Sequence, residues 1–243
     1  MQDRSKLNDY VEAYAGLEGR ALVATVARDF PGRAALLSSF GAESSVLLHM
    51  VSEVAPDLPV VFLDTEKLFP ETLAYRDQLT RELGLTNVRI MKPDGADLNR
   101  VDPDGRLHEN DTDLCCHIRK TVPMDKALRG FDVMISGRKR FHGAARANLD
   151  YVTFADDRLK VEPLAGFSGL ELLGYMQAHH LPSHPLKLLG YRSIGCIPCT
   201  NMGGSDENPR AGRWMGTEKT ECGIHFSANG KVIRTETRQS VPA

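Results

Sequence analysis

The sequence predicts an α/β fold, a single domain in which a mostly parallel sheet is flanked by helices, with a loop-like C-terminal segment. Three observations predict it. Short apolar runs with strand character alternate with stretches of helical periodicity from residue 33 to residue 137. The run 59–64 has the continuous apolar character of a buried strand. A short apolar run at 33–39 passes through a polar, glycine-containing turn into a helical stretch. Such alternation is typical of crossovers between parallel strands.

The expected elements follow one another with few long gaps. Strands are expected at 33–39, 59–64, 88–92 and 132–137, with a hairpin at 151–163 turning at Asp156–Asp157. Helices are expected as a pair within 7–30, broken near Gly16 and Gly19, and at 44–50, 71–83, 114–128 and 168–180. Residues 93–113 leave the sheet, 182–213 are loop-like, and the last dozen residues form a tail. The expected elements therefore divide the chain into N-terminal helices (1–32), an α/β region (33–213) and a C-terminal segment (214–243).

Composition restricts the class of protein. Hydrophobic residues make up 42% and charged residues 26% of the chain, which is ordinary for a globular protein with a substantial core. A net charge of −2 argues against a surface built to hold nucleic acid or an acidic membrane, so a bound anion must be held locally. No apolar run reaches the roughly 18 residues of a membrane span, and the N-terminus is polar. We therefore expect a cytoplasmic protein with no membrane or nucleic-acid partner.

Residues 38–45 (Ser-Ser-Phe-Gly-Ala-Glu-Ser-Ser) are candidates for an anion-binding loop. They join an expected strand to an expected helix, so backbone N–H groups and the helix N-terminus would face a bound anion. The spacing differs from the lysine-containing P-loop. Taken alone, the segment is weak evidence for anion binding and fits a tight turn with a helix cap better.

Residues Leu63-Asp64-Thr65 end the next strand at the same expected edge of the sheet. Open α/β sheets bind their ligands at the carboxyl ends of their strands. Asp64 could accept a hydrogen bond from a ribose hydroxyl or an adenine amine there. Strand termination and helix capping are the alternative explanation for this aspartate.

Five cysteines divide into a group of four and one alone. Without a secretion signal, an odd number argues against a disulfide scaffold. Cys115–Cys116 and Cys196-x-x-Cys199 supply four thiolates, the number needed by a [4Fe–4S] cluster or a structural zinc. Adjacent cysteines crowd a single tetrahedral ion but can bind different irons of a cubane. The pattern favours [4Fe–4S] over zinc, and four unligated thiols are the remaining alternative.

Cys222 stands alone within Thr-Glu-Cys-Gly-Ile-His. Lys219 and His225 lie nearby in the sequence, and such a polar setting favours the thiolate and hence nucleophilicity. A lone cysteine is commonly an inert buried thiol, and the local residues do not decide between the two.

Seven motifs together carry a family resemblance. They are Ser39-Phe-Gly-Ala-Glu, Leu63-Asp-Thr, Pro70-Glu-Thr, Cys115-Cys followed by Ile118-Arg-Lys, Gly190-Tyr-Arg-Ser-Ile-Gly-Cys-Ile-Pro-Cys-Thr, Gly212-Arg-Trp and Lys219-Thr-Glu-Cys-Gly-Ile-His. Over residues 33 to 226 the chain resembles adenylyl-sulfate and phosphoadenylyl-sulfate reductases. The resemblance implies an adenine-nucleotide α-hydrolase-like fold and a place in assimilatory sulfate reduction and cysteine biosynthesis. The two cysteine pairs mark the cluster-bearing branch, which typically uses adenylyl sulfate.

The resemblance also implies roles for particular residues. Cys222 would attack the sulfate sulfur of adenylyl sulfate and become a cysteine S-sulfonate, from which thioredoxin, or glutaredoxin in its place, releases sulfite. Cations would surround the phosphosulfate: Lys120, Arg210, Arg213 and His225. The remaining substrate-binding residues are Ser38, Ser39, Phe40, Gly41, Leu63, Asp64, Thr65, Gly137, Arg138 and Arg146. The sequence does not fix the oligomeric state and allows a homo-oligomer.

One segment departs from the family pattern. Relatives carry Arg-Arg-Asp-Gln and a Thr-Arg pair where this chain reads Gly137-Arg-Lys-Arg-Phe-His and Ala145-Arg-Ala. Positive charge is preserved, but the choice between adenylyl sulfate and its 3′-phosphorylated form stays open, so a phosphoadenylyl-sulfate reductase is the alternative. An ATP pyrophosphatase or sulfate adenylyltransferase subunit would require Ser-Gly-Gly-x-Asp-Ser in the loop. A non-enzymatic iron–sulfur sensor would leave the loop and the Cys222 motif without a use.

Overall fold

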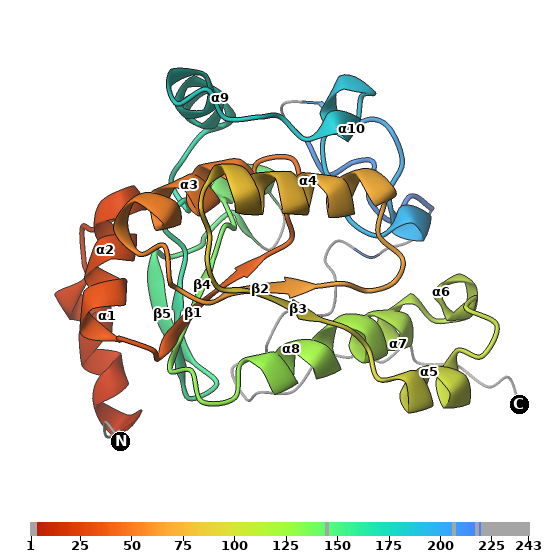
Figure 1. Cartoon of the computed structure of the whole chain (residues 1–243), viewed down its shortest axis with the longest axis horizontal. Coiled ribbons are helices and arrows are strands. Elements are labelled where there is room, and N and C mark those ends of the chain that lie inside the picture. The colour runs from red at the N-terminus through yellow and green to blue at the C-terminus, as the bar shows by residue number, and fades with distance from the viewer. Residues whose placement is uncertain (1–3, 144–145, 206–207, 217–218, 220–243) are drawn as a thin grey trace, which may run out of the picture.

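The computed structural model describes residues 4–143, 146–205, 208–216 and 219. Within them a six-stranded sheet has the order β3-β2-β1-β4-β6-β5 (Figure 1). The strands are β1 (Ala34–Ser38), β2 (Val60–Leu63), β3 (Val88–Met91), β4 (Val133–Ser136), β5 (Val152–Ala155) and β6 (Arg158–Val161). All neighbouring pairs are parallel except β5 with β6, which form the expected hairpin. The prediction of a single, mostly parallel α/β domain is confirmed.

Helices cover both faces of this sheet. In Figure 1, α3 and α4 lie on one side of the sheet, and α7 and α8 lie on the other. The helical elements in chain order are η1 (Arg4–Asn8), α1 (Asp9–Ala13), α2 (Gly19–Asp29), α3 (Ser44–Val54), α4 (Pro70–Glu82), α5 (Gly95–Val101), α6 (Leu107–Asn110), α7 (Thr112–Cys116), η2 (His117–Thr121), α8 (Val122–Ala127), η3 (Arg140–His142), α9 (Gly169–Ala178), α10 (Pro185–Leu188) and η5 (Ile197–Cys199). Among the described residues, no helix has both the length and the apolar character needed to cross a membrane.

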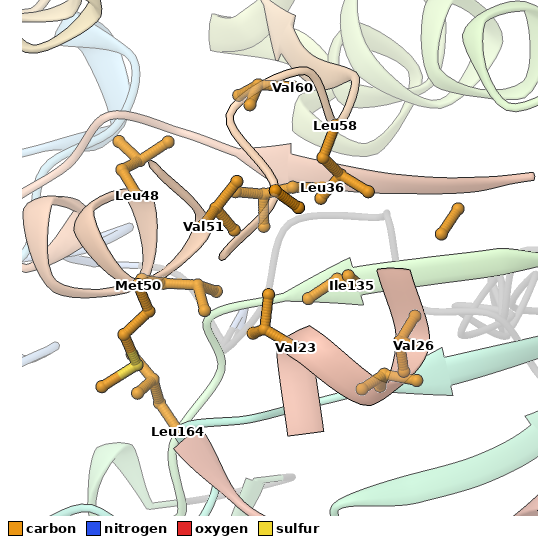
Figure 2. Close-up of a cluster of buried hydrophobic side chains, with 14 of the residues drawn as sticks. Val23, Val26, Leu36, Leu48, Met50, Val51, Leu58, Val60, Ile135 and Leu164 are labelled. Atoms are coloured by element: carbon orange, nitrogen blue, oxygen red, sulfur yellow. The ribbon is translucent and has the colours of Figure 1, made fainter. Parts of the chain in front are cut away.

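Alternation along the strands divides the core between the two faces. Leu36 of β1 packs with α2 and α3 in the larger hydrophobic cluster, where Figure 2 shows it near Val51. Its neighbour Ala35 points the other way and joins a smaller cluster with Met124 and Leu128. Successive side chains of a strand face opposite sides, so both faces of a parallel strand must be apolar. Burying each large aliphatic side chain contributes about 1.5–3 kcal/mol.

Two turns have conformations that their sequences favour. Asp156 and Asp157 both adopt positive φ, 56° and 54°, at the tip of the β5–β6 hairpin, as a two-residue turn of this hand requires. Ser168 caps α9 by accepting from the N–H of Glu171, whose carboxylate accepts in return from the Ser168 N–H. The hairpin and the helix at 168–180 were both expected from sequence.

The expected helix at 114–128 is divided into three parts. α7 and α8 are separated by η2, a π-helical turn that contains Arg119 and Lys120. A π-turn adds a residue to the helical repeat, which changes where the following side chains point. The preceding excursion at 93–113 contains α5 and α6, which are seven and four residues long. Helices this short show too little periodicity to be found from sequence.

Candidate active site

A cavity of about 300 Å³ opens at the carboxyl end of the sheet. Ser38, Leu63 and Ser136, which are the last residues of β1, β2 and β4, all line it. These are neighbouring strands of the sheet. Ligands of open α/β sheets bind in such a position. The volume lies within the range of small-molecule sites.

The cavity brings together most of the residues proposed from sequence as substrate-binding. Those that line it are Ser38, Ser39, Gly41, Leu63, Thr65, Lys120, Gly137, Arg138, Arg146, Arg210 and Arg213. The structure does not place Phe40 and Asp64 among them. Cys222 and His225 lie outside the described residues.

Phe40 and Asp64 have structural contacts instead. The Phe40 ring is fully buried and meets the Phe62 ring edge-on, with 5.4 Å between centroids. Asp64 Oδ1 accepts from the Glu66 N–H at 3.0 Å, and its Oδ2 lies 3.6 Å from Lys92 Nζ. Their side chains therefore shape the loops, and a ligand would meet the residues on either side of them.

Hydrogen bonds within the serine loop and a left-handed residue fix its conformation. Phe40 adopts a left-handed φ of 47°, and its N–H donates to Ser38 Oγ at 3.3 Å. The Ser44 N–H donates to the Gly41 carbonyl at 3.1 Å and leads into α3. A Cβ on Gly41 would lie 3.2 Å from Ser39 Oγ, so glycine keeps this turn tight. The loop and the N-terminus of the eleven-residue α3 thus form a surface suited to an anion.

Arg138 is oriented by a buried carboxylate at the other side of the cavity. Glu162, only 1% exposed, accepts from Arg138 Nε at 2.7 Å and pairs with its Nη2. Its second oxygen accepts from Ser136 Oγ at 2.6 Å and from the Arg138 N–H at 3.2 Å. Because every donor comes from the end of β4, Glu162 fixes the arginine relative to the cavity.

A second ion pair links the serine loop to the basic segment after β4, and sequence reasoning missed it. Glu43 accepts from Lys139 Nζ at 2.7 Å and contacts His142 Nε2 at 3.2 Å. Burial alone would raise the pKa of Glu43, but the charge of Lys139 and the hydrogen bond from His142 outweigh it and hold that pKa well below its usual range. The neighbouring Arg146 reaches His142 Nδ1 at 3.3 Å. No pattern in the sequence signals this pairing, since the partners lie far apart along the chain.

The four grouped cysteines are all buried and free. The loop that carries Cys196 is attached to the segment after β2, where the Ile197 N–H donates to the Lys67 carbonyl at 2.7 Å. Thr65 Oγ1 lies 3.2 Å from Cys196 Sγ. Burial, followed by the proximity of Cys116 and, to a smaller extent, of Cys196 in the other segment, raises the pKa of the Cys115 thiol to about 11. In turn, burial and then the neighbouring Cys196 and Cys116 raise the pKa of Cys199. The two cysteine segments therefore meet in one buried region.

Two arginines connect this region to its surroundings. Arg119, which follows the cysteines on η2, donates twice to Asp102 and once to the Thr65 carbonyl, the latter at 2.9 Å. Arg213 lines the cavity, donates to the Cys199 carbonyl at 3.0 Å and lies over the Trp214 ring. Arg213 thus lies between the cavity, which it lines, and the segment that carries Cys199. Among the described residues, no three His, Cys, Asp or Glu side chains form a group suited to a single metal ion.

A parallel sheet with a serine-rich loop and a basic cavity at its carboxyl edge is typical of α/β proteins that bind nucleotides. Residues 33–202 match the family described as the phosphoadenosine phosphosulfate reductase domain. The adenosine 5′-phosphosulfate reductase of Mesorhizobium japonicum is 46% identical over 215 residues, which cover 88% of this chain and 85% of that protein. The phosphoadenosine 5′-phosphosulfate reductase of Gloeobacter violaceus is 34% identical, covering 92% and 95% of the two chains.

A solved structure has the same fold. The crystal structure of phosphoadenylyl-sulfate reductase from Candida auris superposes with a TM-score of 0.69 at 22% identity, covering 83% of this chain and 98% of that one. The chain therefore belongs to the phosphoadenosine phosphosulfate reductase family, and it is an oxidoreductase. The family expected from the sequence motifs is confirmed.

Proposed function

We propose that this protein reduces adenylyl sulfate to sulfite and AMP in assimilatory sulfate reduction and cysteine biosynthesis. The observation that carries the proposal is that a basic cavity at the sheet edge lies next to a region of four buried cysteines, with Arg213 contacting both. The Mesorhizobium japonicum relative, 46% identical, bears the name of this activity. Thioredoxin, or glutaredoxin in its place, is the proposed donor, and the cytoplasm is the proposed location.

The reacting thiol in this proposal is that of Cys222, the role that the family resemblance implies for it. Its thiolate attacks the sulfate sulfur, the bond from sulfur to the phosphate oxygen breaks, and AMP leaves with the electron pair. The product is a cysteine S-sulfonate. A donor thiolate then attacks the Cys222 sulfur and displaces sulfite, and the donor's second thiol resolves the mixed disulfide. The donor dithiol supplies the two electrons that reduce sulfate to sulfite.

Cationic side chains and backbone N–H groups of the described residues would bind the negatively charged substrate for this reaction. Lys120, Arg210 and Arg213 line the cavity and would screen the approach of a thiolate to the substrate's negative phosphosulfate. The serine loop would hold the nucleotide through its N–H groups. Arg138, fixed by Glu162, would contact the anionic or ribose part of the substrate.

The four buried cysteines fit a [4Fe–4S] cluster. Each iron of a cubane needs one thiolate, and the two pairs come from segments that meet in one buried region. Without such a group the thiols would stay protonated, because burial raises the pKa of Cys115 and Cys199. When bound, the cluster would join the two segments and add a fixed charge beside the cavity. Anaerobically purified protein should absorb visible light and contain about four irons per chain, whereas colourless protein with zinc would refute this assignment.

A phosphoadenylyl-sulfate reductase is the second candidate. The Gloeobacter violaceus relative bears that name, and the segment from Arg138 to Arg146 keeps its positive charge. Sulfite production with thioredoxin, measured as kcat/KM on adenylyl sulfate and on its 3′-phosphorylated form, tests the two. We expect the unphosphorylated substrate to be preferred. The reverse preference would support the second candidate, and no sulfite from either would contradict both.

A further inference from the structure

Glu43 places a carboxylate in the wall of a cavity that several cations also line. It belongs to the serine-loop motif, yet the proposed function gives it no role. Glu43 Oε2 accepts from Lys139 Nζ at 2.7 Å and lies 3.2 Å from His142 Nε2. Burial would raise the pKa of Glu43, but the charge of Lys139 and the hydrogen bond from His142 outweigh it, so the group is ionised at neutral pH. A ligand in this cavity therefore meets a fixed negative charge.

Carboxylates compensate two of the cations in the segment that follows β4. Arg138 pairs with Glu162, and Lys139, which is only 5% exposed, pairs with Glu43. The positive charge between residues 138 and 146 is thus partly offset in the folded protein. A phosphate group beside Glu43 would lie next to a carboxylate, and this juxtaposition of like charges is unfavourable. A hydroxyl group would instead find an acceptor, because a carboxylate has about four lone-pair sites.

The two ends of the cavity determine which part of the proposed substrate lies beside Glu43. One end adjoins the cysteines, because Arg213 donates to the Cys199 carbonyl at 3.0 Å and lies over the Trp214 ring, which packs against Cys199. The other end is formed by Glu43 and Lys139, beyond β1 and β4. In the proposed function the phosphosulfate binds the cations at the cysteine end. The ribose is then directed toward Glu43.

We propose that Glu43 is a specificity-determining residue, whose carboxylate accepts from the ribose 3′-hydroxyl of the substrate and repels a 3′-phosphate. The inference rests on the proposed function, and it names the residue that separates the two candidate substrates. Dinucleotide-binding folds use a carboxylate in a comparable way, to bind a ribose hydroxyl where a phosphate would require a cation. The selectivity therefore comes in part from a repulsive element.

Calorimetric titration of the holoprotein with AMP and with adenosine 3′,5′-bisphosphate tests the proposal without turnover. Wild-type protein should bind AMP more tightly. Glu43→Gln can still accept from a hydroxyl but removes the negative charge and releases Lys139 to bind a phosphate. The preference for AMP should therefore fall about ten- to a hundredfold. The preference in kcat/KM for adenylyl sulfate over its 3′-phosphorylated form should fall in parallel.

Lys139→Met should change the preference in the opposite direction. This variant keeps the Glu43 carboxylate but removes the cation that compensates it, so the bisphosphate should bind less well relative to AMP than it does in the wild type. Titration at pH 8 keeps the charge of His142 out of the comparison, because burial lowers the pKa of that histidine. A merely structural role of the pair would not produce opposite shifts in the two variants.

Glu53→Gln is the matched control. Glu53 lies near the other end of α3 and pairs with the exposed Arg20 at 3.2 Å, so both affinities should equal those of the wild type.

The remaining outcomes separate this inference from the proposed function. If the wild type prefers the bisphosphate, or if Glu43→Gln leaves the preference unchanged, the role of Glu43 is refuted while nucleotide binding stands. Equal losses of affinity for both nucleotides in Glu43→Gln and Lys139→Met, or shifts of preference in the same direction, would assign the ion pair a structural role and overturn the proposal as well. Wild-type protein that binds neither nucleotide would contradict the proposed function itself, and this inference with it.

Discussion

Replacing Asp102 with asparagine removes a buried negative charge while keeping the shape of the side chain. Asp102 is fully buried at its side chain, and the paired Arg119 is 6% exposed. Oδ2 accepts from Arg119 Nε at 3.1 Å and Nη2 at 2.6 Å, and Oδ1 accepts from the Leu107 N–H at 2.8 Å. Burial would raise the pKa of Asp102, but the hydrogen bonds from Arg119 and Leu107 lower it overall, so the group is charged at neutral pH.

Asparagine can accept on one side only and turns an NH₂ group toward a donor on the other. Removing one partner of a buried ion pair costs about 3–5 kcal/mol, because the other charge is left uncompensated. At the lower end of that range, a chain of this length should lose about 6–12 °C in Tm. Asp97→Asn, which weakens an exposed pair with Arg100, is the control and should shift Tm by less than about 2 °C.

Differential scanning calorimetry or circular dichroism on both variants measures these shifts. Equal, small shifts for Asp102→Asn and Asp97→Asn would refute the conclusion that the Arg119–Asp102 pair supports the region of the buried cysteines.

Three further predictions concern the cavity and the core. Gly195→Ala places a Cβ 2.6 Å from Arg213 Cζ, so the guanidinium must move and its buried hydrogen bond to the Cys199 carbonyl is strained; AMP affinity and Tm should both fall, and unchanged affinity would contradict this placement. Glu162→Gln should weaken AMP binding about tenfold by calorimetry, because Arg138 loses its charged partner; wild-type affinity would disprove that role. Burial lowers the pKa of His184 to about 4, below its unfolded value, so stability falls by up to about 3 kcal/mol as the pH drops from 6.5 to 4. His184→Gln should not show this loss of stability between those pH values. If the pH profile of Tm is the same for His184→Gln as for the wild type, His184 is not the cause of the loss.

The sequence predicted what depends on local pattern. Apolar periodicity located every strand, and because parallel strands end at one edge, it also placed Ser38 and Leu63 at the same cavity. Cysteine spacing identified two pairs, which the structure brings into one buried region. Both results follow from chain neighbours and from the period of a strand.

The sequence could not predict contacts that the tertiary fold creates. Glu43 meets Lys139 because β4 lies beside β1 in the sheet, although the two residues are far apart in the chain. Local motifs also mislead about direction. The left-handed backbone at Phe40 turns its ring into the core, and the turn after β2 occupies the Asp64 carboxylate with the Glu66 N–H. Neither direction can be read from residue type. The roles proposed for Cys222 and the division of the chain at residues 32 and 213 stay predictions.

Label transfer without a donor tests the central claim most directly. Pure protein mixed with radiolabelled adenylyl sulfate in the absence of thioredoxin should take up about one label per chain and release an equal amount of AMP. Peptide mapping should place the label on Cys222, and thioredoxin should then release it as sulfite. A Cys222→Ser variant that still acquires the label, or wild-type protein that produces sulfite without passing through a labelled form, would contradict the account.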